Sequence, residues 1–143
     1  KEAIAAYLVP YSGGVVLIET GPGSTVSELI RNLKMVGFKP SDITHVFLTH
    51  IHLDHAGASG WLAKQGARVF VHPAGEQHMI NPEKLLMSAK RIYEDKMDLL
   101  WGDFLPVPSE KITSVSDGEK IKVDGLIFTA IHTPGHAEHH ISW

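Results

Sequence analysis

Two histidines stand two residues apart directly after an apolar stretch of the chain. The stretch is Ile43–Leu48, rich in β-branched residues, which predicts a buried β-strand. It is followed by Thr49-His50-Ile51-His52. Because side chains alternate along a strand, His50 and His52 point to the same side and can bind one metal ion. Histidine is also the commonest metal ligand in proteins, and this chain has 10 of them and no cysteine.

An aspartate and a third histidine continue the same segment. Asp54 and His55 are adjacent, so they can converge on a second metal ion only where the backbone turns. The small residues of 56–60 provide that turn and let the backbone pass close by. Open α/β sheets also commonly bind ligands where a strand ends and the following helix begins. The segment therefore predicts a site for a pair of metal ions.

A second histidine motif, Ile131-His132-Thr133-Pro134-Gly135-His136, follows another predicted strand. We expect His132 to complete a three-histidine site with His50 and His52, an arrangement that leaves room for water on a catalytic zinc ion. His136 is expected to orient a ligand or contact the substrate, with an ordinary solvated loop histidine as the alternative.

Together, the two histidine motifs resemble the metallo-β-lactamase superfamily, in its glyoxalase II and lactonase-like hydrolase branch. The resemblance runs in order along essentially the whole chain, through Ile18-Glu19-Thr20-Gly21, residues 43–55 and residues 132–136. The pair of histidine motifs is highly specific for that superfamily, whereas Glu-Thr-Gly alone would be weak. The implied fold is α/β, a four-layer αβ/βα sandwich with internal pseudo-symmetry.

The resemblance also implies cofactors and ligands. The implied cofactors are two divalent metal ions, with zinc favoured over iron or manganese. The implied ligands come from both motifs: His50, His52 and His132 for the first metal, Asp54 and His55 for the second. Asp54 is in addition expected to be catalytic, because it can orient the attacking nucleophile.

Three departures from the family pattern bear on these expectations. Glu19 stands where the family usually has aspartate, in a supporting position. His52 stands where the flavodiiron branch usually has glutamate, which argues against that branch. The family's bridging aspartate and final histidine lie beyond the second motif, whereas this sequence ends at Trp143. We therefore expect residues 1–143 to be one metallo-β-lactamase-like domain, incomplete at its C-terminus: the N-terminal half of the sandwich, with one sheet face exposed.

Hydrophobic periodicity and turn residues predict alternating strands and helices, which is typical of a layered α/β domain. A capping box of Thr25 and Glu28 predicts the start of one helix, which Gly37 ends. Two more helices are predicted around Trp61 and after Pro82. The predicted strands are Ile4–Val9, Val15–Glu19, Ile43–Leu48, Arg68–Val71, Ile121–Val123 and Leu126–Ile131.

The predicted function is metal-dependent hydrolysis, in which a metal-bound hydroxide cleaves an acyl bond (thioester, lactone or related ester) in a small molecule. One alternative with the same fold is a mononuclear iron persulfide dioxygenase, using His50, His132 and a downstream aspartate. A second is a phosphodiesterase acting on nucleic acid. A third is a binding or structural protein that has lost the metal.

Charge and hydropathy limit the partners. The net charge of −3 and the lack of a Lys/Arg cluster argue against nucleic acid. No apolar run approaches the roughly 18 residues that span a bilayer. We therefore expect a small-molecule substrate, no nucleic acid and no membrane, with homo-oligomerisation left open. The absence of cysteine fits a reducing, cytoplasmic compartment.

The remaining histidines are expected to play lesser roles. His72 and His78 follow a predicted strand and are assigned to loops or to the surroundings of the pocket. His139 and His140 fall at the start of a predicted last strand, where alternation turns one inward and one outward. His45 is expected to be structural.

Overall fold

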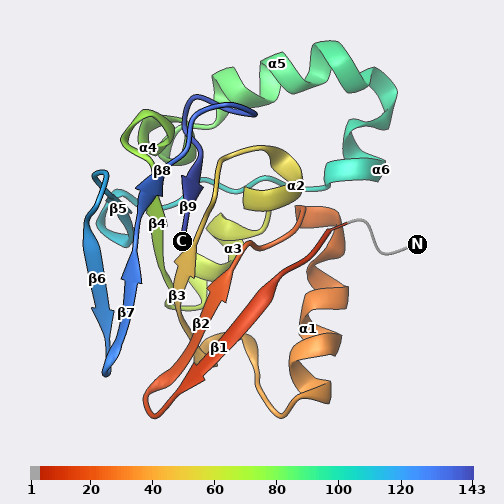
Figure 1. The fold of residues 1–143 in the computed structure, drawn as a ribbon. Helices are drawn as coiled ribbons and strands as arrows, with labels where there is room; N and C mark the ends of the chain where they lie inside the picture. The colour runs from red at the N-terminus through yellow and green to blue at the C-terminus, as the bar shows by residue number, and fades with distance from the viewer. Residues whose placement is uncertain (1–3) are drawn as a thin grey trace.

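A five-stranded sheet forms the centre of the molecule in the computed structural model, which describes residues 4–143 (Figure 1). Its strands are β1 (Tyr7–Tyr11), β2 (Gly14–Ile18), β3 (Ile43–Phe47), β4 (Arg68–Val71) and β5 (Ile112–Ser114). They lie in the order β1-β2-β3-β4-β5; β1 is antiparallel to β2, and the others are parallel. The carboxyl ends of parallel strands meet at one edge of a sheet, so the residues that follow β2, β3 and β4 are brought together there.

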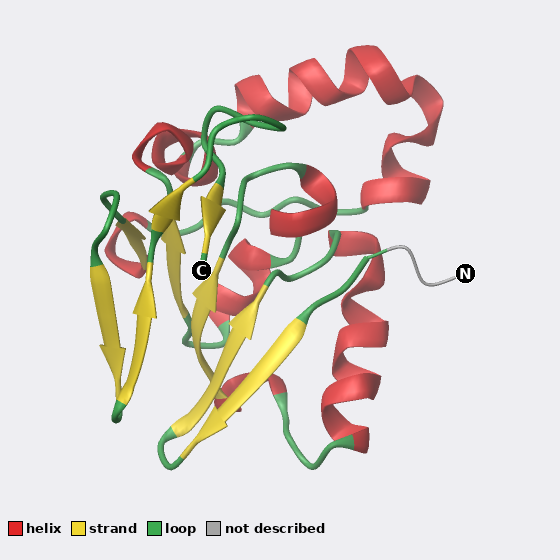
Figure 2. Ribbon diagram, in the orientation of Figure 1, coloured by secondary structure: helices red, strands yellow, loops and turns green. Residues whose placement is uncertain are grey.

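Helices cover one face of this sheet (Figure 2). They are α1 (Val26–Met35), α2 (Leu53–Ala56), α3 (Ser59–Lys64), α4 (Pro73–Ile80), α5 (Glu83–Tyr93) and α6 (Met97–Trp101). Short 3₁₀ turns lie at Gly23–Thr25, Pro40–Asp42, Glu94–Lys96 and Ser109–Lys111. None of the helices within residues 4–143 is long and apolar enough to cross a membrane.

The parallel strands are buried on both faces, and their side chains alternate between two cores. Val46 of β3 belongs to the core beneath the helices, together with Leu33 of α1. The next residue, Phe47, belongs to a second core on the opposite face. In β4, Val69 and Phe70 divide in the same way. This alternation explains why these strands read as continuous apolar runs in the sequence.

The second face is covered by two hairpins, so the expectation of an exposed sheet face is wrong for this face. The hairpins pair β6 (Lys120–Val123) with β7 (Leu126–Thr129), and β8 (Ile131–His132) with β9 (Ile141–Ser142). Phe47 stacks on Trp143 with ring centroids 4.5 Å apart, and it lies 4.7 Å from the ring of Phe128. The C-terminal residues thus fold back onto the sheet and build this core.

Several predicted elements are confirmed with shifted ends. β4 has its predicted bounds, and β3 ends one residue earlier than expected. The first strand, predicted at Ile4–Val9, instead runs from Tyr7 to Tyr11 with Pro10 inside it, and the turn to β2 lies at Ser12–Gly13. The predicted capping box is wrong: Thr25 makes no side-chain cap, and its hydroxyl donates to the carbonyl of Pro22. Helices α2, α4 and α6 were not predicted: α2 and α6 are only 4 and 5 residues long, and the apolar residues of α4 show no clear helical periodicity.

Candidate metal centre

The histidine motifs meet where β3 ends. Residues 48–52 leave the carboxyl end of β3 and enter α2, and His52 is the N-cap of that helix. The backbone here is packed too closely for a side chain at Gly57. A Cβ atom at this position would lie 2.5 Å from the carbonyl oxygen of Leu53 and 2.6 Å from Cα of Pro22. The close backbone approach predicted for the small residues after His55 is therefore confirmed at Gly57.

His50 is the buried member of the site, with a relative exposure of 4%. Its Nδ1 lies 2.8 Å from the hydroxyl oxygen of Thr49. With Nδ1–H donating to that hydroxyl, the lone pair of the imidazole is on Nε2. Nε2 is buried and has no hydrogen-bond partner. Since a buried polar atom without a partner is costly, this atom fits a position that ligates a metal ion.

His52 and His136 face His50. Nδ1 of His52 lies 3.2 Å from Nε2 of His136, and both rings lie within 5.0 Å of each other and of the His50 ring, centroid to centroid. One ring nitrogen from each of the three residues lies within 4.8 Å of the other two. We call His50, His52 and His136 the histidine cluster. The donor set, three imidazoles, suits zinc and other divalent transition metals.

The structure does not place His132 in this cluster, so its predicted position beside His50 and His52 is corrected. The Nε2 atom of His132 lies 2.9 Å from the carbonyl oxygen of Val115, and its ring centroid lies 4.2 Å from that of His72, with the two rings tilted by 43°. Its backbone N–H donates to Asp117. His132 belongs to β8, whereas His136 lies in the loop between β8 and β9, which bends back over the end of β3. His136, in the loop, thus occupies the position that was predicted for His132, in the strand.

Asp54 and His55 form a second pair of candidate ligands beside the cluster. Oδ2 of Asp54 lies 3.4 Å from Nε2 of His55, and the His55 ring is 4.0 Å from the ring of His50. Nδ1 of His55 donates to Oε2 of Glu19 at 3.1 Å. That hydrogen bond places the lone pair of His55 on Nε2, next to the carboxylate of Asp54. The structure thus brings Asp54 and His55 together beside the cluster, on helix α2.

Glu19 supports this pair from a strained backbone. It follows β2, its φ is 65°, and it is 4% exposed. A positive φ in a residue other than glycine costs free energy, and such strain is kept mainly at functional sites. Here it lets the carboxylate bind the backbone N–H of Thr49 through Oε1 and His55 through Oε2. From the sequence, Glu19 was expected only to hold a supporting position. Its place as a charged residue directly after an apolar strand was the sequence signal that could have indicated this role.

Thr49 connects the segments that carry the ligands. Its N–H donates to Glu19, its hydroxyl binds Nδ1 of His50, and its carbonyl accepts from Ile141 N at 2.7 Å. Ile141 begins β9, which closes the loop that contains His136. Thr49 therefore contacts His50 directly, His55 through Glu19, and the loop of His136 through Ile141. No role was predicted for Thr49 from the sequence.

Burial and the neighbouring imidazoles lower the pKa of both His50 and His52 and so favour their neutral forms. Burial, and then the nearby rings of His55 and His52, lower the pKa of His50 to about 3. The pKa of His52 is lowered by burial and then by His136. Burial raises the pKa of the Glu19 carboxyl, against the hydrogen bonds from Thr49 and the charge of His55. Neutral imidazole is the form that binds metal, so His50 and His52 are ready to do so at neutral pH.

Other histidines surround the centre. His139 accepts weakly from the backbone N–H of Ile51 at 3.5 Å, and its ring is 5.8 Å from that of His52. Nδ1 of His140 lies 2.7 Å from the hydroxyl of Thr133. His139 and His140 precede β9 instead of opening it, so strand alternation does not decide their directions. His72 is the N-cap of α4 and accepts from Ala74 N.

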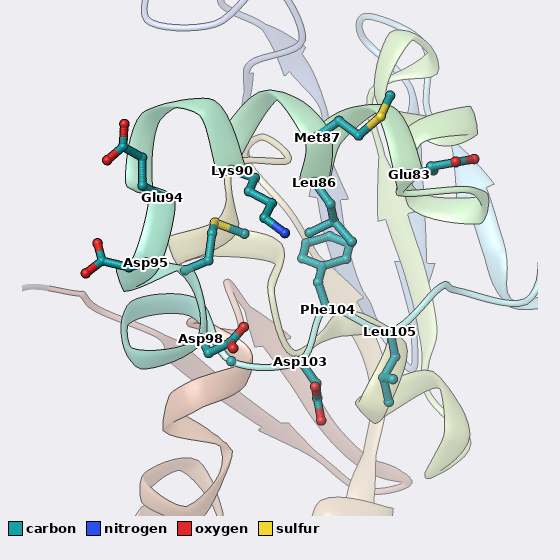
Figure 3. A pocket seen from close by; sticks show the side chains of 12 residues that line it. Glu83, Leu86, Met87, Lys90, Glu94, Asp95, Asp98, Asp103, Phe104 and Leu105 are labelled. Atoms are coloured by element: carbon teal, nitrogen blue, oxygen red, sulfur yellow. The ribbon is translucent and has the colours of Figure 1, made fainter.

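Two hollows differ in their relation to this centre. A pocket of about 440 Å³ opens on it and is lined by Ile4, Ala5, Tyr7, Ile18, Glu19, Thr49, His50, Asp54, His55, His136 and His140. A larger hollow of about 640 Å³ lies between α5, α6 and residues 102–105 (Figure 3). Its rim carries Glu94, Asp95, Asp98 and Asp103 around Lys90, and no histidine lines it. The smaller pocket is therefore the candidate substrate site.

Fold and site together define an α/β domain with a histidine-based metal-binding edge. The sequence matches the family model of the metallo-beta-lactamase superfamily over residues 2–143. The chain belongs to this superfamily, and the α/β fold class predicted from the sequence is confirmed.

Three similar proteins illustrate the relationship. The lactamase-like protein aptB of Emericella nidulans is 31% identical over 136 residues, which are 94% of this chain and 34% of that protein. Hydroxyacylglutathione hydrolase GloC of Haemophilus influenzae is 31% identical over 122 residues, 85% of this chain and 52% of that protein. The crystal structure of a metallo-beta-lactamase family protein from Thermus thermophilus is 28% identical with a TM-score of 0.74, covering 95% of this chain and 48% of that one. The chain thus spans between a third and about half the length of these proteins.

Proposed function

We propose that this chain carries the metal-binding half of a hydrolase that cleaves a small-molecule acyl bond, in a thioester, lactone or related ester. The observation that carries the proposal is the buried, unpartnered Nε2 of His50, which faces the ring nitrogens of His52 and His136. The name of the relative GloC, a hydroxyacylglutathione hydrolase, supports an acyl thioester as one candidate substrate.

The residues of the site divide the work. His50, His52 and His136 would hold one divalent ion, and Asp54 and His55 would contribute to holding a second. When bound, such ions lower the pKa of a coordinated water toward 7 and stabilise the oxyanion that forms on the acyl group. Asp54 can accept a hydrogen bond from the attacking water and orient it, since its carboxylate is half-exposed at the pocket.

The reaction balances without a redox partner. A bond forms between the water oxygen and the acyl carbon, and the bond from that carbon to sulfur or oxygen breaks. The proton released by water goes to the departing thiolate or alkoxide. No serine or cysteine nucleophile is needed. Zinc remains our proposal for the metal, with iron or manganese as alternatives.

Metal analysis of the full-length protein tests the proposal. Protein purified without chelator should contain about two equivalents of divalent metal per chain. The double variant His50→Ala/His52→Ala should lose the metal, whereas the control His78→Ala, on α4, should keep it. A metal-free wild type, or full retention of metal in the double variant, would overturn the assignment.

Kinetics test the reaction itself. Wild-type protein should hydrolyse acyl thioesters or lactones, and Asp54→Asn should lower kcat by a factor of about 100 or more with the fold unchanged. An oxygen-uptake assay distinguishes the proposed hydrolase from the alternative, a persulfide dioxygenase, because only the dioxygenase consumes oxygen. That alternative paired His50 with His132, and it is less favoured because His132 contacts the carbonyl of Val115 and is not part of the histidine cluster.

A further inference from the structure

Part of the lining of the pocket at the metal centre is apolar. This part, which we call the apolar wall, consists of Ile4, Ala5, Tyr7 and Ile18, and the rest of the lining includes the imidazoles and carboxylates of the centre. Tyr7 is 61% exposed and Ile4 is 39% exposed, so both present large apolar surfaces to solvent. An isolated exposed apolar residue needs no explanation, but neighbouring ones in one pocket do.

The strand register fixes part of this wall beside the metal centre. Tyr7 of β1 lies directly opposite Ile18 of β2 in the antiparallel pair. Opposed residues in such a pair project their side chains from the same face of the sheet. Ile18 directly precedes Glu19, whose carboxylate binds His55. The apolar wall therefore starts one residue from the group that orients a candidate metal ligand.

The chemistry of the lining selects the kind of ligand group that fits. The wall offers no charged side chain and no cation to a ligand carboxylate. Ligand pockets commonly combine an apolar lining with a few convergent polar groups, as this one does. An uncharged alkyl group on the wall would place an attached carbonyl toward the histidines.

We propose that Ile4, Tyr7 and Ile18 bind the apolar acyl group of the substrate, so that the enzyme prefers uncharged medium-chain acyl groups over short or anionic ones. The inference rests on the proposed function and names the substrate class of the same pocket.

A chain-length series on the full-length, metal-loaded protein tests this proposal. The substrates are N-acetylcysteamine thioesters with acetyl, butanoyl, hexanoyl and octanoyl groups, plus succinyl as the anionic case. In the wild type, kcat/KM should rise by up to about fourfold per methylene that the wall buries, and succinyl should be a poor substrate. Tyr7→Ser should lower the ratio of octanoyl to acetyl kcat/KM, and Tyr7→Phe should retain it. The matched control is Ile127→Ser, because Ile127 is 59% exposed but lies on β7 outside the pocket lining.

A binding measurement separates failure of this inference from failure of the proposed function. Calorimetry with the corresponding non-hydrolysable alkyl thioethers should show a dissociation constant that falls with chain length, less steeply in Tyr7→Ser. If thioesters are hydrolysed without any chain-length preference, or if Tyr7→Ser leaves the preference unchanged, the inference is overturned and the hydrolase proposal stands. If no ester is hydrolysed while thioether binding still depends on chain length and on Tyr7, the reaction is wrong and the apolar subsite stands.

Discussion

Oε2 of Glu19 lies 3.1 Å from Nδ1 of His55, and Oε1 of the same carboxylate accepts the backbone N–H of Thr49 at 2.9 Å. This carboxylate–histidine contact fixes which nitrogen of His55 is left to bind a metal ion. Thr49, whose N–H donates to this carboxylate, also contacts Nδ1 of His50 through its hydroxyl. The candidate centre is thus held by groups around the ligands as well as by the ligands themselves.

Replacing Glu19 tests the carboxylate. Glu19→Gln keeps an acceptor for Thr49 but removes the charge beside His55, so affinity for the second metal ion should fall about 10- to 100-fold. Titration of metal-free protein with cobalt, followed by absorbance, measures this. The control Glu28→Gln changes an exposed glutamate on α1 and should leave affinity unaltered. If Glu19→Gln and the wild type bind the second metal ion with equal affinity, Glu19 does not support the metal ligands.

Replacing Thr49 tests the hydroxyl that contacts His50. Thr49→Val preserves the shape but leaves the buried Nδ1 of His50 without a partner, which costs about 1–3 kcal/mol. Both thermal stability of the metal-free protein and metal affinity should fall, whereas Thr49→Ser should restore most of each. Long-range proton–nitrogen NMR of the metal-free protein reports the His50 tautomer directly. A tautomer that is unchanged in Thr49→Val would contradict the role of the hydroxyl.

Two alanine variants decide between the histidines of the second motif. His136→Ala removes one of the three clustered ligands, so it should lower affinity for the first metal ion by orders of magnitude. His132→Ala instead removes a hydrogen bond to Val115 and should reduce stability by about 0.5–1.5 kcal/mol with metal stoichiometry retained. Elemental analysis and thermal melts of both variants give the answer. Loss of metal in His132→Ala alone would restore the prediction made from the sequence.

Acid should destabilise the metal-free protein through His50. Its pKa is lowered from 6.5 to about 3, so the folded state favours the neutral ring. This contribution is fully present above pH 6.5 and is lost as the pH falls toward 3, because the unfolded chain then binds the proton more readily. For one proton the slope is at most about 1.4 kcal/mol per pH unit. Urea unfolding between pH 7 and 4 should show a shallower dependence in His50→Gln; parallel curves would refute the attribution.

Local sequence was sufficient for the first half of the site and for the parallel strands. His50, His52, Asp54 and His55 lie in one short segment, which leaves β3 after Phe47 and enters α2, so they come together without help from distant parts of the chain. The run Ile43–Phe47 and the strand Arg68–Val71 are buried on both faces, which gives them an unambiguous apolar signature. These features depend on residues that are close together in the chain, so they can be predicted from the local pattern of residue types.

Only the tertiary structure decided which histidine of the second motif joins them. β8 is two residues long, and the loop after it closes through the hydrogen bond from Thr133 N to His140 O. That closure carries His136 over the end of β3 and leaves His132 beside His72. Glu19 and Thr49 are likewise partners across 30 residues of chain. Such pairings arise from loop closure and strand register between distant segments, so no local periodicity in the sequence encodes them.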